Sequence, residues 1–186
     1  MNNEMKLVLI HSGEDEEGLQ PALVNWVADV LAQRAEFEPW WVEPAHLMAR
    51  SDNAVVQESL RHLADADAFL IITSEHRNVH HCELKAFIER VSDRWHARPV
   101  AFIGYGAASG GLCAIDQLRQ ILAGQHAVPI CNFVSFPDPW ALIDGDGVLR
   151  QPDQARLPMA RMLVQLNWWA RALKAARQQM PYALVS

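Results

Sequence analysis

The segment Ala68-Phe-Leu-Ile-Ile-Thr73 is a short apolar run rich in Ile and Phe, which is typical of a strand buried on both faces. A polar loop over 74–82 follows it, and 83–96 then carries apolar residues at helical spacing. A second apolar run over 98–103 leads into a glycine-rich loop over 104–111, after which the chain is helical again. Two parallel strands joined by a helix, each followed by a polar or glycine-rich loop, predict the ligand-binding side of an open α/β sheet.

The rest of the chain extends this alternation of strands and helices. Further strands are expected at 5–10, 38–43 and 127–134, and further helices at 19–35, 54–66 and 155–179. The segments 44–53 and 135–154 are expected to be irregular. In the helix 54–66, Val55, Leu60 and Leu63 are expected to face inward. The pattern predicts one α/β domain over residues 1–186, with a five-stranded parallel sheet between helical layers.

Composition excludes several classes of protein. The net charge of −6 argues against a general nucleic-acid-binding protein, which requires a basic face. No apolar run approaches the roughly 20 residues of a membrane-spanning helix, so no membrane partner is expected. The N-terminus lacks the features of a signal peptide. The three cysteines, Cys82, Cys113 and Cys131, are widely spaced, which favours free thiols and a cytoplasmic location.

Three loops are expected to meet where the strands end, at the switch point between the first and third strands. They are 11–18, 73–82 and 104–111. The glycines of the third loop are typical of a backbone that approaches a flat ligand, although a plain strand-to-helix turn has the same composition. Tyr105 in this loop is expected to stack on such a ligand or to cover it.

The loop 73–82 also holds the weak catalytic candidates of the chain, which are His76, Arg77, His80 and Cys82. A histidine beside Cys82 would activate its thiol as a nucleophile. Arg77 places a fixed cation at the mouth of the site, or is an ordinary solvated residue. No metal site is predicted, because closed zinc sites draw on two separated pairs of ligands and this loop is one short segment.

The segment Thr73-Ser-Glu-His-Arg-Asn78 with Glu83-Leu-Lys85 resembles the Pro-Glu-Tyr-Asn-Gly…Leu-Lys signature of the NAD(P)H-dependent FMN reductases. The segments Arg98-Pro-Val and Gln117-Leu-Arg119, together with the glycine loop between them, resemble the next part of that pattern. The resemblance implies a flavodoxin-like three-layer sandwich with strand order 2-1-3-4-5. It also implies bound FMN, NADPH or NADH as the hydride donor, and a small-molecule electron acceptor.

By the same resemblance, two loops and the end of the first strand hold the cofactor. The implied cofactor-binding residues are Ser12, Ser74, Glu75, His76, Arg77, Asn78, Gly104, Tyr105, Gly106, Gly110 and Gly111. The family also pairs the helix 83–96 with its copy in a second subunit. The apolar stripe of this helix is wider than one sheet contact requires, so we expect it to be exposed and to form a homodimer interface. The stripe consists of Leu84, Phe87, Ile88, Val91 and Trp95.

The first loop departs from the family. Where the family has a pattern like Gly-Ser-Thr-Arg-Glu-Gly-Arg around the FMN phosphate, this chain has Ser12-Gly-Glu-Asp-Glu-Glu-Gly18. Glu14 and Asp15 therefore replace a hydroxyl donor and a cation. Two hypotheses follow. The first is an FMN-dependent NAD(P)H oxidoreductase, and the second is a flavin-free descendant that acts as a binding module or uses the loop from His76 to Cys82.

Overall fold

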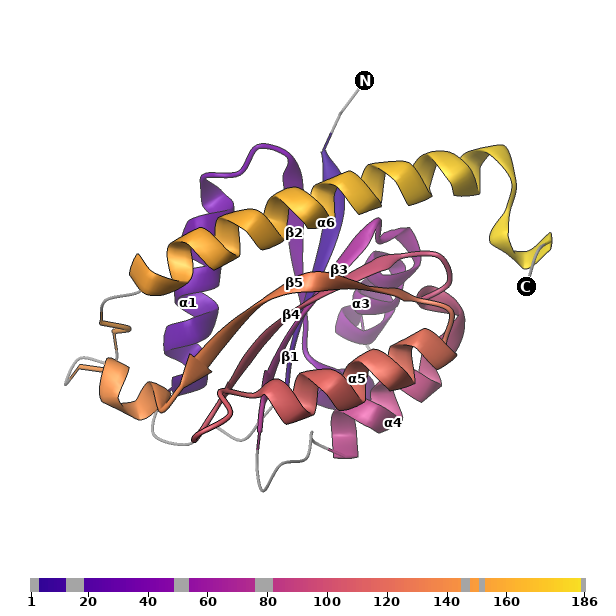
Figure 1. Ribbon diagram of the computed structural model, residues 1–186. Coiled ribbons are helices and arrows are strands. Elements are labelled where there is room, and N and C mark those ends of the chain that lie inside the picture. Colours follow the sequence, from indigo (N-terminus) through magenta and orange to yellow (C-terminus); the bar gives the residue numbers. More distant parts are fainter. Residues whose placement is uncertain are drawn as a thin grey trace.

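The structure is a computed structural model that describes residues 4–12, 19–48, 54–75, 82–144, 148–150 and 153–184. Its centre is a parallel sheet of five strands in the order β2-β1-β3-β4-β5 (Figure 1). The strands are β1 (Met5–Ser12), β2 (Phe37–Val42), β3 (Ala68–Ser74), β4 (Pro99–Gly106) and β5 (Val128–Pro137). The predicted fold class and strand order are confirmed.

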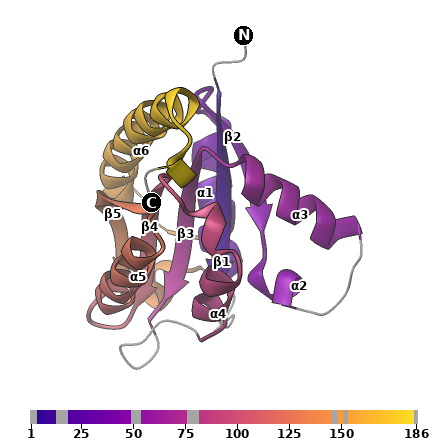
Figure 2. The same cartoon turned by 90° about the vertical axis from the view of Figure 1, so that its right-hand side faces the viewer.

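Helices cover both faces of this sheet. They are α1 (Leu19–Ala32), α2 (Pro44–Met48), α3 (Ala54–Asp65), α4 (Cys82–Arg90), α5 (Leu112–Gly124) and α6 (Asp153–Gln179). Three short 3-10 helices lie at Ser92–Arg94, Pro139–Leu142 and Tyr182–Leu184. Figure 2 shows α3 on one side of the sheet and α6 on the other. The helix α2 is a correction, because the segment 44–53 was expected to be irregular.

The side chains of β1 alternate between two cores. Leu7 and Leu9 are fully buried against α1 and α6, and Val8 and Ile10 are fully buried against the helices of the opposite face. This period of two is what a strand covered on both faces requires. It follows that His11, the next odd residue of β1, lies on the α1 side.

The apolar stripe of the predicted helix 83–96 is buried within the chain. Leu84, Phe87, Ile88 and Trp95 are 0% exposed and Val91 is 5% exposed. The indole N–H of Trp95 donates a 3.0 Å hydrogen bond to the carbonyl oxygen of Ile88. The expectation of an exposed apolar interface on this helix is therefore wrong. The stripe is wide because the chain turns after α4 and folds Trp95 back under Phe69 and Phe87.

An ionic cluster holds the opposite end of the sheet, where the strands begin. The buried Asp67 carboxylate accepts hydrogen bonds from the backbone N–H of Lys6 at 3.2 Å and from the Lys174 ammonium at 2.7 Å. Arg177 lies 3.5 Å from its other oxygen. Arg98 donates to the carbonyl oxygens of Ala64 and Ala66 at the end of α3. Burial lowers the pKa of the Arg98 guanidinium to about 10.

Candidate functional site

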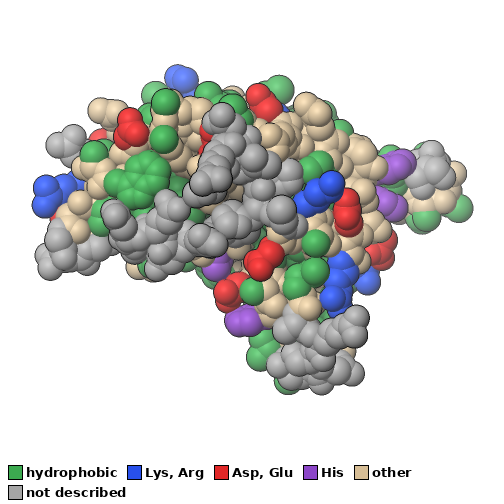
Figure 3. Space-filling model, turned by 90° about the horizontal axis from the view of Figure 1, so that it is seen from below, with side chains coloured by type: hydrophobic (Ala, Val, Ile, Leu, Met, Phe, Trp, Pro, Cys, Tyr) green, Lys and Arg blue, Asp and Glu red, His purple; other side chains and the backbone are tan. Residues whose placement is uncertain are grey.

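The carboxyl ends of β1, β3 and β4 lie side by side. Ser12 is paired with Thr73, Thr73 with Gly104, and Ser74 with Tyr105. The first and third strands are neighbours here, and their connections run to opposite faces of the sheet, which is the switch point of this topology. Figure 3 views the molecule from this end, and acidic and basic side chains are interspersed over its described part.

The glycines after β4 are required by the packing of their own loop. Gly111 has φ +87°, and a Cβ atom there would lie 2.5 Å from the backbone nitrogen of Tyr105. Gly110 has φ +59°, and a Cβ atom there would collide with the Ser135 hydroxyl. The Ser135 hydroxyl donates a 2.8 Å hydrogen bond to the Gly110 carbonyl oxygen. These two glycines therefore fit the loop tightly between β4 and the end of β5.

The solvent side of this loop is small and uncharged. Ala107, Ala108, Leu112 and Cys113 are exposed, and Ser109 is half-buried. The described residues of the three loops, which are 11–12, 73–75, 82 and 104–111, include no lysine or arginine. Such a surface suits a flat, largely apolar ring and offers no cation to a phosphate.

Glu75 joins two of the predicted ligand loops. Its backbone N–H donates a 2.8 Å hydrogen bond to the Tyr105 carbonyl oxygen. Its carboxylate accepts a short hydrogen bond from the Ser109 hydroxyl and a 3.2 Å hydrogen bond from the backbone N–H of Cys113. The amide of Glu75 is thus engaged within the protein, and its side chain fixes the glycine loop.

Tyr105 lies inside the core. Its side chain is 4% exposed and packs in the cluster formed by the sheet with α1 and α6. In this conformation its ring offers no open face on which a ligand could stack. The Cβ of Gly106, if present, would lie 3.0 Å from the Cβ of Glu75, so these two strand ends are in close contact.

Several predicted site residues lie outside the described part of the chain. They are His76, Arg77, Asn78 and His80, and also Glu14 and Asp15 of the first loop. For Ser12 and Cys82 the structure describes only the backbone, at the end of β1 and the start of α4. Among the described residues, no group of three or more histidine, cysteine or acidic side chains is placed to hold a metal ion.

His11 is a polar residue at the strand ends that sequence reasoning did not select. Its Nδ1 lies 2.5 Å from the Gln20 side-chain nitrogen in the first turn of α1, and its ring centroid is 6.2 Å from that of Trp41. Burial lowers the pKa of His11, while Glu43 raises it and His46 lowers it by weaker charge interactions. Its position in the sequence was the signal that could have found it, since it directly follows the apolar residues 5–10 and is the first residue of the predicted loop 11–18.

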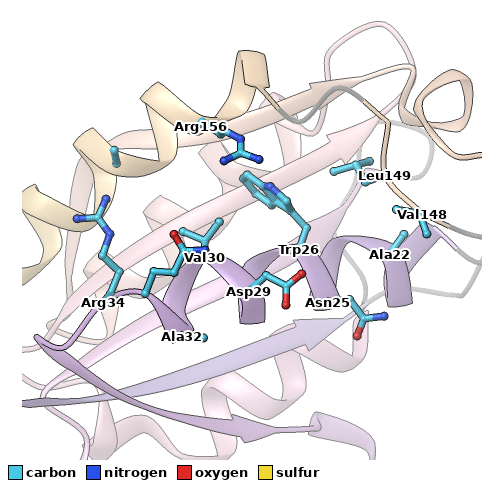
Figure 4. Close-up of a pocket in the computed structure, with 12 residues that line it drawn as sticks. Ala22, Asn25, Trp26, Asp29, Val30, Ala32, Arg34, Val148, Leu149 and Arg156 are labelled. Carbon is cyan, nitrogen blue, oxygen red and sulfur yellow. The ribbon is translucent and has the colours of Figure 1, made fainter.

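A hollow among the described residues lies away from the strand ends. It has a volume of about 930 Å³ and runs between α1 and α6 (Figure 4). Its floor is apolar and includes Trp26, while Asp29, Arg34 and Arg156 line its sides with charges of both signs. It lies beside the helices rather than at the switch point, so it is not our candidate for the flavin site.

The described residues can be tested against FMN, the cofactor of the family that the sequence resembles. The ring half of FMN is flat and largely apolar, and it fits the small exposed residues of the glycine loop beside Ser74. The family resemblance assigns the phosphate half to 13–18, which lie outside the described residues. The ring-side residues therefore fit the cofactor.

The fold and the switch-point site define a flavodoxin-like α/β protein. A model of the NADPH-dependent FMN reductase family matches residues 5–141. This match spans most of the chain, and the chain belongs to that family. A comparison with curated protein sequences gives no match.

Solved structures support the fold. FerB, a flavoenzyme NAD(P)H:(acceptor) oxidoreductase from Paracoccus denitrificans, is 16% identical with a TM-score of 0.69, over 89% of this chain and 97% of that chain. The apo form of the NADH:FMN oxidoreductase EMOB is 15% identical with a TM-score of 0.57, over 91% and 88%. A C101A mutant of flavodoxin from Pseudomonas aeruginosa is 18% identical with a TM-score of 0.55, over 90% and 99%. At these identities the likeness concerns the fold alone.

No described helix is long and apolar enough to cross a membrane.

Proposed function

We propose that the chain is an FMN-dependent NAD(P)H oxidoreductase that passes electrons to a small-molecule acceptor. The observation that carries this proposal is the family match over residues 5–141, which includes the three strand ends and the loops between them. FMN, when bound, supplies the hydride chemistry between the nicotinamide and the acceptor. The family assignment does not favour the flavin-free alternative.

In this proposal the protein binds and orients the cofactor and its substrates, and it does not itself transfer protons. Ser74, Glu75 and the loop from Gly106 to Gly111 would hold the ring of the cofactor, and the alanines of that loop are exposed to solvent. Because the cofactor carries the chemistry, no acid, base or nucleophile of the protein is required. His76, Arg77, Asn78 and His80 stay as proposed site residues on the strength of the family resemblance.

The deciding experiment is the absorption spectrum of purified protein incubated with FMN and passed through a gel-filtration column. We expect the flavin band to elute with the protein, and added NADPH or NADH to bleach it without oxygen. Steady-state oxidation of the two nucleotides, with quinones and free flavins as acceptors, then identifies the donor and the acceptor. A protein that elutes without the band and leaves FMN fluorescence unchanged would show that the proposal is wrong.

We also propose that the protein is cytoplasmic, as its widely spaced cysteines indicate, and that it is a homodimer that pairs through α4, as the family resemblance implies. The exposed side of α4 carries Glu83, Lys85 and Glu89, so pairing there rests on charges. Exposed charge pairs are screened by salt, so the dimer should weaken as salt is raised. Light scattering at low and high salt tests this, with 20.9 kDa as the mass of a monomer. A monomer at both salt concentrations contradicts it.

A further inference from the structure

We propose that Glu75 is a positioning residue, which caps α5 from a distant loop and thereby holds the glycine loop in the shape that receives the flavin ring. This inference rests on the proposed function. Glu75 follows β3 directly, and α5 begins after β4, so the contact joins segments 38 residues apart.

The first turn of α5 lacks a cap of its own. The residue before the helix is Gly111, which has a left-handed backbone and no side chain to accept a hydrogen bond from the helix. The first N–H groups of a helix require an acceptor, which a Ser, Thr, Asp or Asn at this position normally supplies. Here the Glu75 carboxylate accepts from the N–H of Cys113, the second residue of the helix.

The same carboxylate oxygen also holds the loop that precedes the helix. It accepts the hydrogen bond of the Ser109 hydroxyl, while the backbone N–H of Glu75 binds the Tyr105 carbonyl oxygen. A single residue thus contacts the strand end, the middle of the loop and the first helical turn. A carboxylate near a helix N-terminus is further favoured by the helix dipole.

This arrangement has a consequence for binding. A loop that is already ordered loses little conformational entropy when a ligand binds, so preorganisation increases affinity. The Glu75 contact lies on the ring side of the site. Removing it should therefore weaken FMN and riboflavin by the same factor, since the two ligands share the ring and differ in the phosphate.

The test measures the Kd of both flavins for wild type, Glu75→Ala, Glu75→Gln and Ser109→Ala. Glu75→Ala removes both side-chain hydrogen bonds and should raise both Kd values by about 10- to 100-fold. Glu75→Gln keeps an acceptor oxygen and should stay within about threefold of wild type. Ser109→Ala leaves the cap intact and should fall between the two. Glu58→Ala, which removes an exposed acid on α3, is the matched control and should bind like wild type.

Amide hydrogen exchange gives a readout that does not depend on flavin. Exchange at the N–H of Cys113 should accelerate in Glu75→Ala and not in Glu75→Gln. Equal flavin binding by Glu75→Ala and wild type, or unchanged exchange at Cys113, would overturn the inference. If Glu75→Gln fails as fully as Glu75→Ala, negative charge acts rather than the hydrogen-bonded cap, and the inference is also wrong. If wild type binds neither flavin, the proposed function is wrong. The exchange rate at Cys113 in the Glu75 variants then tests the hydrogen bond from Glu75 to α5 independently of flavin.

Discussion

The Lys174 ammonium lies 2.7 Å from the Asp67 carboxylate, although the two residues are 107 positions apart in the chain. Asp67 stands immediately before β3, and Lys174 lies in the last third of α6. The pair therefore attaches the C-terminal helix to the end of the sheet at which the strands begin. Because the Asp67 side chain is only 6% exposed, its carboxylate oxygens contact these partners in place of bulk water.

Replacing Asp67 with Asn should therefore destabilise the protein strongly. The change removes the negative charge and leaves Lys174 and the half-buried Arg177 without their acid, at a cost of about 2–4 kcal/mol. The matched control is Asp65→Asn, which breaks the exposed pair with Lys6 and should cost under about 1 kcal/mol. Urea unfolding measures both. Equal effects of the two substitutions would show that the buried cluster contributes no more than a surface pair.

Two glycines of one helix region should respond in opposite directions to substitution by alanine. Gly111→Ala places a Cβ atom 2.5 Å from the Tyr105 nitrogen at φ +87°, and should destabilise the fold by about 1–3 kcal/mol or more. Gly124→Ala, at the end of α5, meets no atom within 4 Å and should stabilise it by about 0.4–1 kcal/mol. Urea unfolding of the two variants compares them, and a stabilising Gly111→Ala would contradict the described loop.

His11 should make the stability of the protein fall as the solution is acidified. Burial lowers its pKa in the folded state below the ordinary 6.5, so the unfolded chain binds the proton more readily. Stability from this group is complete above about pH 6.5 and is lost as the pH falls toward the folded-state pKa. Unfolding free energies at about pH 7.5 and 5.5 should differ more for wild type than for His11→Gln. An equal difference in both proteins would contradict this prediction.

The first loop should limit the affinity for FMN. Glu14 and Asp15 replace the donor and cation of the family, so wild type should bind FMN about as tightly as riboflavin. Glu14→Thr combined with Asp15→Arg should strengthen FMN binding by about 2–4 kcal/mol, less at high salt, and leave riboflavin unchanged. Isothermal titration of both flavins measures this. Nanomolar binding of FMN by wild type would show that the phosphate finds other partners.

The sequence predicted the architecture because the central strands β3 and β4 are apolar runs and strands alternate with helices along the chain. It failed where that signal is short or ambiguous. The helix Pro44–Met48 is too short to show a period. The run Ala54-Val-Val56 does not indicate which of its residues faces the core. The inward residue is Val56, which is 8% exposed, rather than Val55, which is 54% exposed. The apolar stripe over 84–95 predicted a partner chain because the sequence does not show that Trp95 packs against Phe69, which is 26 residues earlier in the chain.

The candidate site was predicted only in outline. The loops that meet at the switch point follow from the order of strands and helices, so Ser74, Gly106 and Gly111 were expected there. The roles within the loops depend on strand register, which places Ser74 beside Tyr105 and brings Glu75 to α5. No local pattern in the sequence indicates that register. Glu75 was therefore predicted as a ligand contact, and its hydrogen bonds to Ser109 and Cys113 were not predicted.

The close fit of Gly110 and Gly111 between two strands has a consequence for how this loop changes in evolution. A substitution there damages folding before it affects any ligand, so selection for a folded protein alone preserves both glycines. The exposed alanines beside them carry no such constraint and are free to change with the substrate. Among diverging relatives, these glycines should thus record shared ancestry of the fold, while the neighbouring positions record what each protein binds.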